Sequence, residues 1–146
     1  MLTYAKAKPD DIPLIYQMAS ELIAQYEDFS GMNKEKVLTW TKRSIECHLP
    51  QYTRVCLNDQ LAAFYRLTAE DDKYELDNLF VLPCFRGQGI GSEILRKCIS
   101  ETDRDLFLYV FRENTGAVRL YERMGFRITE SVSTTRQIMT YAKEGC

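Results

Sequence analysis

A glycine-rich loop at residues 86–91, Arg-Gly-Gln-Gly-Ile-Gly, is the strongest chemical signal in this chain. Glycines let the backbone turn tightly and approach a ligand closely. The unpaired N–H groups of a helix's first turn and the helix dipole favour an anion such as a phosphate or pyrophosphate. Because the loop lies between a predicted strand and a predicted helix, we expect an anion-binding site there. Its predicted ligand-binding residues are Arg86, Gly87, Gln88, Gly89, Ile90, Gly91 and Ser92.

A nicotinamide or flavin dinucleotide is one candidate ligand of this loop. The dinucleotide-binding fingerprint is G-x-G-x-x-G/A, and Gly87, Gly89 and Ser92 occupy its three defined positions. That fingerprint normally opens a βαβ domain, whereas this loop follows a predicted antiparallel meander. Dinucleotide binding is therefore the weaker alternative.

A second motif lies one strand further along the chain. Residues 79–91 and 114–126 together resemble the GNAT superfamily of acyl-CoA-dependent N-acetyltransferases. The first segment looks like the family's Q/R-x-x-G-x-G/A loop, and the second like its N-x-x-A-x-x-L-Y-x-x-x-G-F helix. The resemblance implies an enzyme that transfers an acetyl group from acetyl-CoA to a primary amine by direct attack in a ternary complex.

The resemblance also implies where acetyl-CoA binds. Its pyrophosphate would lie on the backbone amides of residues 86–91, and its pantetheine arm would pair with the strand that ends at Val81. The resemblance implies that the strands at residues 74–81 and 106–111 splay apart, and that the cleft between them admits the cofactor and then the amine. Asn114 matches a position that commonly contacts the pantetheine, and Arg123 is within reach of the 3′-phosphate. Outside the loop, the implied cofactor-binding residues are Leu79, Phe80, Val81, Asn114, Ala117, Tyr121 and Arg123.

Acetyl transfer to an amine needs a base that accepts a proton and an acid that helps the thiolate leave. Tyr121 matches the family's acid; its alternative role is that of a buried structural tyrosine. Glu75 and Asp77 alternate onto one face of the strand at residues 74–81. The resemblance makes Glu75 the preferred base, because it matches an acidic position that several family members use, and partial burial there would raise its pKa. The alternative for both carboxylates is a solvated strand end. Tyr109 stands where some family members have a further carboxylate.

Hydrophobic periodicity and turn residues predict the element order β-α-α-β-β-β-α-β-α-β-β. The expected strands are residues 2–7, 52–57, 61–67, 74–81, 106–111, 126–132 and 135–141, and the expected helices are residues 9–26, 33–48, 87–100 and 115–124. We therefore expect one domain over residues 1–146. Its predicted class is α/β (α+β mixed), a GNAT-like acyl-CoA N-acyltransferase fold with a mostly antiparallel sheet of about seven strands and four flanking helices.

Composition excludes several partner classes. The chain has 146 residues, 45% of them apolar and 27% charged, with a net charge of −2, so no polycationic face for nucleic acid is expected. The apolar runs are too short to cross a membrane. The five cysteines lack metal-ligand spacing, so we expect no metal and reduced thiols in the cytoplasm. A homodimer could form through an edge strand such as residues 135–141.

The amine acceptor stays open at this stage. Residues 26–32, between the first two helices, offer an aromatic and acidic rim, but a metabolite amine, a polyamine, an antibiotic and a protein amine all remain candidates. His48 is expected to be a packed or capping residue. A catalytically silent acyl-CoA-binding or interaction module is the alternative to an enzyme.

Overall fold

The computed structural model describes residues 1–143, and its strands form one seven-stranded sheet. The strands are β1 (Leu2–Lys6), β2 (Tyr52–Leu57), β3 (Gln60–Glu70), β4 (Lys73–Val81), β5 (Asp105–Phe111), β6 (Arg127–Ser131) and β7 (Arg136–Tyr141). Their order in the sheet is β1-β2-β3-β4-β5-β7-β6. The β4–β5 pair is parallel, and the other neighbours are antiparallel.

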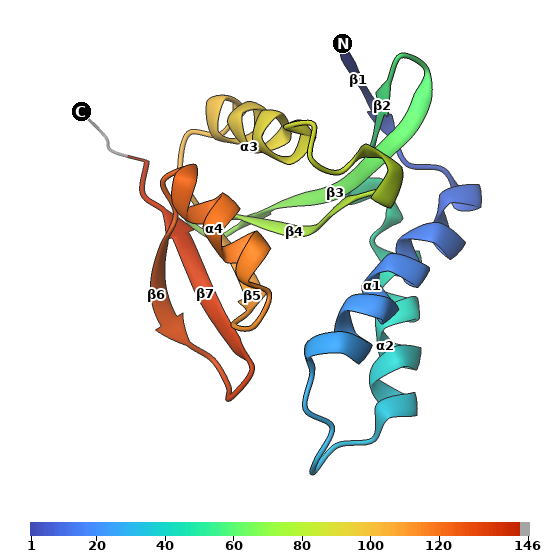
Figure 1. Cartoon of the computed structure of the whole chain (residues 1–146), viewed down its shortest axis with the longest axis vertical. Helices are drawn as coiled ribbons and strands as arrows, with labels where there is room; N and C mark the ends of the chain where they lie inside the picture. The colour runs from blue at the N-terminus through green and yellow to red at the C-terminus, as the bar shows by residue number, and fades with distance from the viewer. Residues whose placement is uncertain (144–146) are drawn as a thin grey trace.

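Four α-helices cover the two faces of this sheet (Figure 1). They are α1 (Ile12–Tyr26), α2 (Lys34–Cys47), α3 (Ile90–Glu101) and α4 (Thr115–Arg123). Short 3₁₀ turns lie at Pro9–Asp11, Leu49–Gln51 and Pro83–Phe85. The predicted mixed α/β fold, with its mostly antiparallel sheet and four helices, is confirmed. No helix within residues 1–143 is both long and apolar enough to cross a membrane.

Each face of the sheet has its own hydrophobic core. Side chains alternate across a strand, so neighbouring residues of β3 enter different cores. Phe64 packs with Ile15 of α1 and Ile45, in the core beneath α1 and α2. Tyr65 packs with Ile94 and other residues of α3, in the core that α4 also covers. The sheet is therefore the middle layer of three.

β4 and β5 pair over a short distance and then diverge. Their parallel pairing joins residues 73–75 to residues 105–107 and goes no further. Beyond it, Asn78 has a φ of +50°, and the β3–β4 register shifts at this place. The Asn78 side-chain amide donates a hydrogen bond of 2.6 Å to the hydroxyl of Tyr52, which is 2% exposed. This contact fixes a bulge that bends β4 away from its neighbour.

The ends of α3 and α4 follow from their glycines. Gly87 and Gly89 have φ values of +80° and +78°, so α3 begins at Ile90 and the predicted start at Gly87 is wrong by three residues. Gly125, after α4, has a φ of +101°, as a helix-ending glycine needs. Phe126 then packs back into the core, 1% exposed.

The predicted edge strand is not at the edge. β7 lies between β5 and β6, so residues 135–141 have no free side for a second chain. β6 is the edge on this side, and all five of its residues are exposed. After β6 the chain reverses direction in the Ser133–Arg136 turn, and β7 then pairs with β6 on one side and with β5 on the other. β6 is therefore the outermost strand. A homodimer stays a prediction, and β6 would be its strand on this side of the sheet.

Candidate functional site

A cavity of about 990 Å³ opens where β4 and β5 diverge. The glycine-rich loop and α4 line one end of it. At the other end lie α1, α2 and the side chains that β3, β4, β5 and β7 point into the opening. One continuous cavity therefore joins the predicted anion site to the predicted catalytic residues.

The glycines of the loop serve two purposes. Gly87 and Gly89 adopt left-handed backbone conformations, and a Cβ built on either would have no heavy atom within 4 Å. A Cβ on Gly91 would lie 3.1 Å from the Leu120 side chain, so this glycine lets α3 approach α4 closely. Gly87 and Gly89 thus shape an open loop at the N-terminus of α3, where backbone N–H groups can bind an anion.

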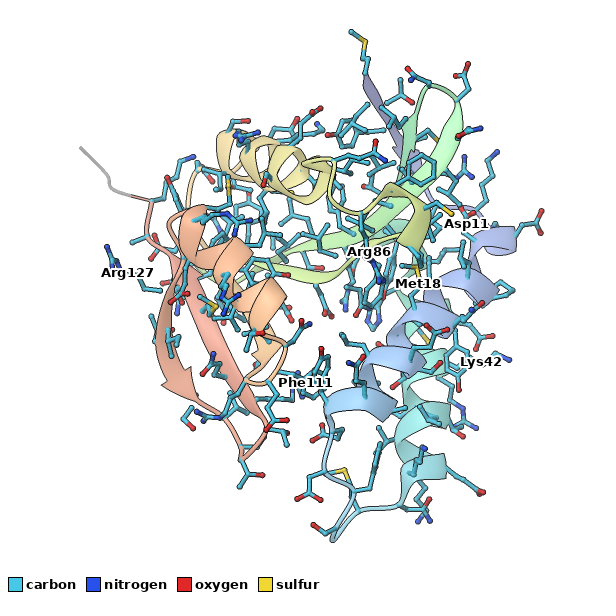
Figure 2. All side chains as sticks on the ribbon, in the orientation of Figure 1. Asp11, Met18, Lys42, Arg86, Phe111 and Arg127 are labelled. Carbon is cyan, nitrogen blue, oxygen red and sulfur yellow. The ribbon has the colours of Figure 1, made fainter. Side chains whose placement is uncertain are left out.

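Two loop side chains hydrogen-bond to nearby main-chain oxygens. The Arg86 Nε donates to the Val81 carbonyl at 3.0 Å, and Arg86 lies between the loop and α1 (Figure 2). The Gln88 side-chain amide donates to the Cys84 carbonyl at 3.4 Å. Gln88 does not line the cavity, so its side chain stays away from the predicted ligand, although its backbone N–H remains part of the loop.

α4 contributes Tyr121 to the middle of the cavity. Asn114 caps this helix, because its side-chain oxygen accepts the Ala117 N–H at 3.4 Å. Burial raises the pKa of the Tyr121 hydroxyl to about 12, and the charge of Asp77 adds to the rise. Tyr121 therefore keeps its proton at neutral pH and can donate a hydrogen bond or a proton into the cavity.

Two carboxylates of β4 face the same cavity. Burial raises the pKa of Glu75, and the charge of Asp77 raises it further. Burial also raises the pKa of Asp77, although Arg66 opposes this with its Nη1 3.6 Å from the Asp77 Oδ2. Asp77 accepts the Asn78 N–H at 2.8 Å as well. Glu75 has no ion-pair partner within 4 Å among residues 1–143, which makes it the freer proton acceptor.

The opposite wall is aromatic, and of its rings the sequence identified Tyr26, in the predicted rim at residues 26–32, but neither Phe111 nor Trp40. The rings of Tyr26 and Phe111 stack with their centroids 5.9 Å apart, and Phe111 lies between the end of β5 and α1 (Figure 2). Trp40 of α2 lines the cavity with 70% of its surface exposed. These side chains come from three separated elements, so no single-segment periodicity could have grouped them.

His48 also lines this wall. It is the C-cap residue of α2, and its Nδ1 lies 2.8 Å from the Ser44 carbonyl oxygen. A carbonyl only accepts, so Nδ1 carries the proton in this contact and Nε2 is left as an acceptor in the neutral ring. The capping role expected from the sequence is present, and the histidine is a cavity residue as well.

The structure brings nearly all of the sequence-predicted site residues to one cavity. The cavity is lined by Glu75, Asp77, Leu79, Phe80, Val81, Arg86, Gly87, Gly89, Ile90, Gly91, Ser92, Asn114, Ala117, Tyr121 and Arg123. Tyr109 lines it too, 40% exposed. These residues lie together, and their individual roles stay predictions.

The candidate metal ligands and the thiols can be located within residues 1–143. No group of three or more His, Cys, Asp or Glu side chains could hold a metal ion in this part of the chain. Cys47, Cys56, Cys84 and Cys98 are free thiols. Burial raises the pKa of Cys98 to about 12, which keeps it protonated and unreactive. Cys146 lies outside the described residues.

Several proteins of known family are similar to this chain. An uncharacterized N-acetyltransferase of Methanocaldococcus jannaschii is 40% identical over 62 residues, which are 40% of this chain and 27% of that relative. A peptidyl-lysine N-acetyltransferase of Salmonella typhimurium is 35% identical over 80 residues, 55% of this chain and 52% of the relative. The chain thus matches about half or less of the length of these two relatives.

Two further similarities extend over nearly the whole fold. The [ribosomal protein bS18]-alanine N-acetyltransferase of Escherichia coli is 28% identical over 130 residues, 86% of this chain and 81% of the relative. An N-acetyltransferase of Thermoplasma acidophilum, solved in complex with coenzyme A, superposes with a TM-score of 0.72 at 18% identity, covering 97% of this chain and 99% of that one. The family model described as acetyltransferase (GNAT) family matches residues 15–126. The chain belongs to the acetyltransferase (GNAT) family.

Proposed function

We propose that this protein transfers an acetyl group from acetyl-CoA to a primary amine by direct attack in a ternary complex. The observation that carries the proposal is the continuous cavity that joins the glycine-rich loop, Tyr121 and Glu75. Its volume of about 990 Å³ is large enough for a ligand of drug size or above. The acetyltransferase relatives and the neighbour solved with coenzyme A support the same activity.

Residues 86–91 and the first turn of α3 would bind the pyrophosphate through backbone N–H groups, with Arg86 adding positive charge. The open space around Gly87 and Gly89 fits this role, because no side chain fills the concave side of the loop. Arg86 would release the Val81 carbonyl, which then becomes available to a pantetheine amide. Acetyl-CoA supplies the activated thioester.

Glu75 would accept a proton from the acceptor amine, directly or through water, as the amine nitrogen bonds to the acetyl carbon and the carbon–sulfur bond breaks. Tyr121 would give its proton to the departing sulfur. Burial raises the pKa of both groups, which keeps the phenol protonated and makes Glu75 a stronger base than a solvated glutamate. Atoms and charges balance, because Glu75 takes up one proton and Tyr121 releases one, and transfer of a proton from Glu75 to the Tyr121 oxygen through water restores both groups.

Two alternatives are less well supported. The antiparallel β3–β4 pairing before the loop differs from the parallel sheet that a dinucleotide-binding domain requires. A silent acyl-CoA-binding module would keep the loop but would not need partly buried, protonatable groups in the lining of the cavity.

The four free thiols within residues 1–143 support a reducing, cytoplasmic location, which we also propose.

Acetyl-CoA is expected to stabilise the protein against thermal unfolding, and NADH is not. Acetyl-CoA at a hundred times its Kd adds about 2.7 kcal/mol to the free energy of unfolding, or a rise in Tm of about 5–10 °C for a chain of this size. The measurement is a thermal melt with each ligand in parallel. A shift with NADH alone would contradict the proposed function.

Changing Gly89 to alanine is expected to weaken acetyl-CoA binding at least tenfold. A left-handed φ costs an alanine about 1–2 kcal/mol, so the loop would relax away from the geometry that aims its N–H groups. Gly31→Ala is the matched control, because Gly31 also has a positive φ, +83°, and open space around its Cβ, but lies outside the cavity. Both variants should lose similar stability by urea unfolding. Equal acetyl-CoA affinity in the two would exclude the loop as the binding site.

A further inference from the structure

Arg136, the first residue of β7, is held in place on two aromatic rings of β5. Its guanidinium carbon lies 4.8 Å from the centroid of the Tyr109 ring and 5.8 Å from that of Phe111. These two residues lie on the same side of β5, and all three line the cavity. Stacking on aromatic faces orients a guanidinium without neutralising its charge.

The turn before Arg136 is tied to the end of α1. The Thr135 hydroxyl donates a 2.6 Å hydrogen bond to the Glu27 carboxylate, and the Thr135 carbonyl accepts the Arg112 N–H at 2.8 Å. Tyr26 stacks on Phe111 from the same end of α1. These contacts hold the start of β7, and with it Arg136, in place before any ligand binds, and they occupy the Glu27 carboxylate with a hydrogen bond from Thr135.

The guanidinium of Arg136 has no anionic partner in residues 1–143. No carboxylate lies within 4 Å of it, and its side chain donates no hydrogen bond in this part of the chain. Arg66 differs, because it contacts Asp77 and donates to the Gln51 side-chain oxygen at 2.7 Å.

The strands give the cavity two acids and two arginines, Glu75, Asp77, Arg66 and Arg136, whose charges sum to zero. Asp77 and Arg66 face each other, which leaves Glu75 and Arg136 as one anion and one cation without close partners. The charges of Arg66 and, to a smaller extent, Arg136 oppose the burial that raises the pKa of Glu75, and Arg136 acts in the same direction on Asp77. Arg136 therefore lies within electrostatic reach of both carboxylates, although it forms an ion pair with neither. A wall of this kind matches a ligand that carries one positive and one negative group. A polycation would meet Arg136 as a repulsive charge.

We propose that the acceptor is a zwitterion, an amine that also carries a carboxylate or phosphate, and that Arg136 binds this anionic group while Glu75 faces the amine. The proposal rests on the acetyl transfer proposed above and adds the class of acceptor. Arg136 is then a specificity-determining residue. Its bidentate fork suits both anions, and the acceptors tested must distinguish them.

Binding can be tested apart from turnover. Trp40, the single tryptophan of the chain, lines the same cavity, so its fluorescence can report occupancy. The two probes are N-acetyl-L-phenylalanine and N-acetylphenethylamine, which differ by a carboxylate, each titrated in the presence of CoA. The carboxylate probe should bind at least tenfold more tightly. Arg136→Gln should remove this preference, and Arg136→Lys should keep part of it.

Turnover is measured with matched acceptors: L-phenylalanine against phenethylamine, O-phosphoethanolamine against ethanolamine, and spermidine. The zwitterion of at least one pair should have a kcat/KM at least tenfold above its partner, and Arg136→Gln should raise its KM with little change in kcat. A preference within the phenylalanine pair would identify the anionic group of the acceptor as a carboxylate, and a preference within the ethanolamine pair would identify it as a phosphate. Arg127→Gln is the matched control, since Arg127 is an exposed residue of β6 that points away from α1 (Figure 2).

The possible failures are distinguishable. Equal binding of the two N-acetylated probes, a carboxylate preference that survives Arg136→Gln, or a preference for spermidine would overturn the zwitterion site. Acetyl transfer with no preference within either pair would overturn it too, while the proposed function would stand. Arg136-dependent binding of the carboxylate probe, with no acetyl transfer to any amine, would overturn the proposed function and leave the anion site in place.

Discussion

Replacing Tyr121 by phenylalanine is expected to lower kcat for acetyl transfer by about 10²- to 10⁴-fold, the usual contribution of a general acid. The phenylalanine ring keeps the packing against Phe126, whose ring centroid lies 5.8 Å away, so the cavity keeps its shape. Acetyl-CoA affinity should stay within about twofold, because the hydroxyl acts on the departing sulfur rather than on the phosphates. Steady-state kinetics with a binding titration give both quantities.

Tyr141→Phe is the matched control for this substitution. Tyr141 packs on the same Phe126 ring, with centroids 5.7 Å apart, but does not line the cavity. Its variant should retain kcat and differ from the native chain only slightly in stability. If both variants lost activity equally, packing around Phe126 would be the cause and Tyr121 would have no acid role.

Replacing Glu75 by glutamine is expected to lower kcat/KM by about 10²-fold or more and to change its pH dependence. A base must be deprotonated to act, so activity in the native chain rises with pH as Glu75 loses its proton. Because burial raises the pKa of this carboxyl above its ordinary value of 4.5, the rise is centred above pH 4.5. In Glu75→Gln this rise in kcat/KM with pH is absent, and the rise that follows deprotonation of the acceptor amine remains. A pH profile of kcat/KM for the two proteins tests the assignment.

The same substitution should stabilise the protein at neutral pH. With its pKa raised in the folded state, Glu75 binds its proton more tightly in the folded than in the unfolded chain. The free energy of unfolding therefore falls as pH rises from about 4.5 through the raised pKa. Glutamine cannot ionise, so Glu75→Gln should be more stable than the native chain at pH 7 and nearly equal to it at pH 4, by urea unfolding.

Two further variants identify the carboxylate. Asp77→Asn should lose less activity than Glu75→Gln, because Asp77 already faces Arg66. Glu130→Gln, on exposed β6, should change neither the pH profile nor the stability difference. If the increase of kcat/KM with pH disappeared in Asp77→Asn and persisted in Glu75→Gln, Asp77 would be the base.

Local sequence signals predicted the loop and the helix that follows it well. Glycine spacing at residues 86–91 and the Asn114 cap depend on backbone requirements within a few residues, and both are present in the structure. The start of α3 was missed by three residues, because a glycine run can belong either to a helix or to the turn before it. The left-handed conformation of Gly89 places this residue in the turn before α3 and not in the helix.

No local sequence signal predicted the opening of the sheet, and only the family resemblance implied that the strands at residues 74–81 and 106–111 splay apart. Asn78 is one polar residue in an otherwise regular strand, and its positive φ depends on the buried Tyr52 hydroxyl, 26 residues earlier in the chain. An asparagine tolerates this conformation better than most residues, but tolerance alone does not indicate a bulge.

The acceptor wall has the same limitation. Its residues come from separate elements and meet only once the sheet and its layers are assembled: Tyr26 from α1, Trp40 and the C-cap residue His48 from α2, Phe111 from β5 and Arg136 from β7. Each is an ordinary residue in its own segment. Charge pairing across elements, such as that of Arg66 with Asp77, then determines which side chains stay unpaired.

The short pairing of β4 with β5 has a consequence for solubility. Beyond Glu75 and Phe107, the facing sides of the two strands no longer pair with each other, and the Val81 carbonyl is bound by the Arg86 side chain instead. The protein therefore has two open strand sides in its interior. Such sides are templates for aggregation when another chain can reach them. Here α1 and α4 flank the opening and keep other chains out. Loss of α1 packing alone would therefore expose these sides while most of the sheet stayed folded, and a ligand that fills the opening would protect against aggregation as well as against unfolding.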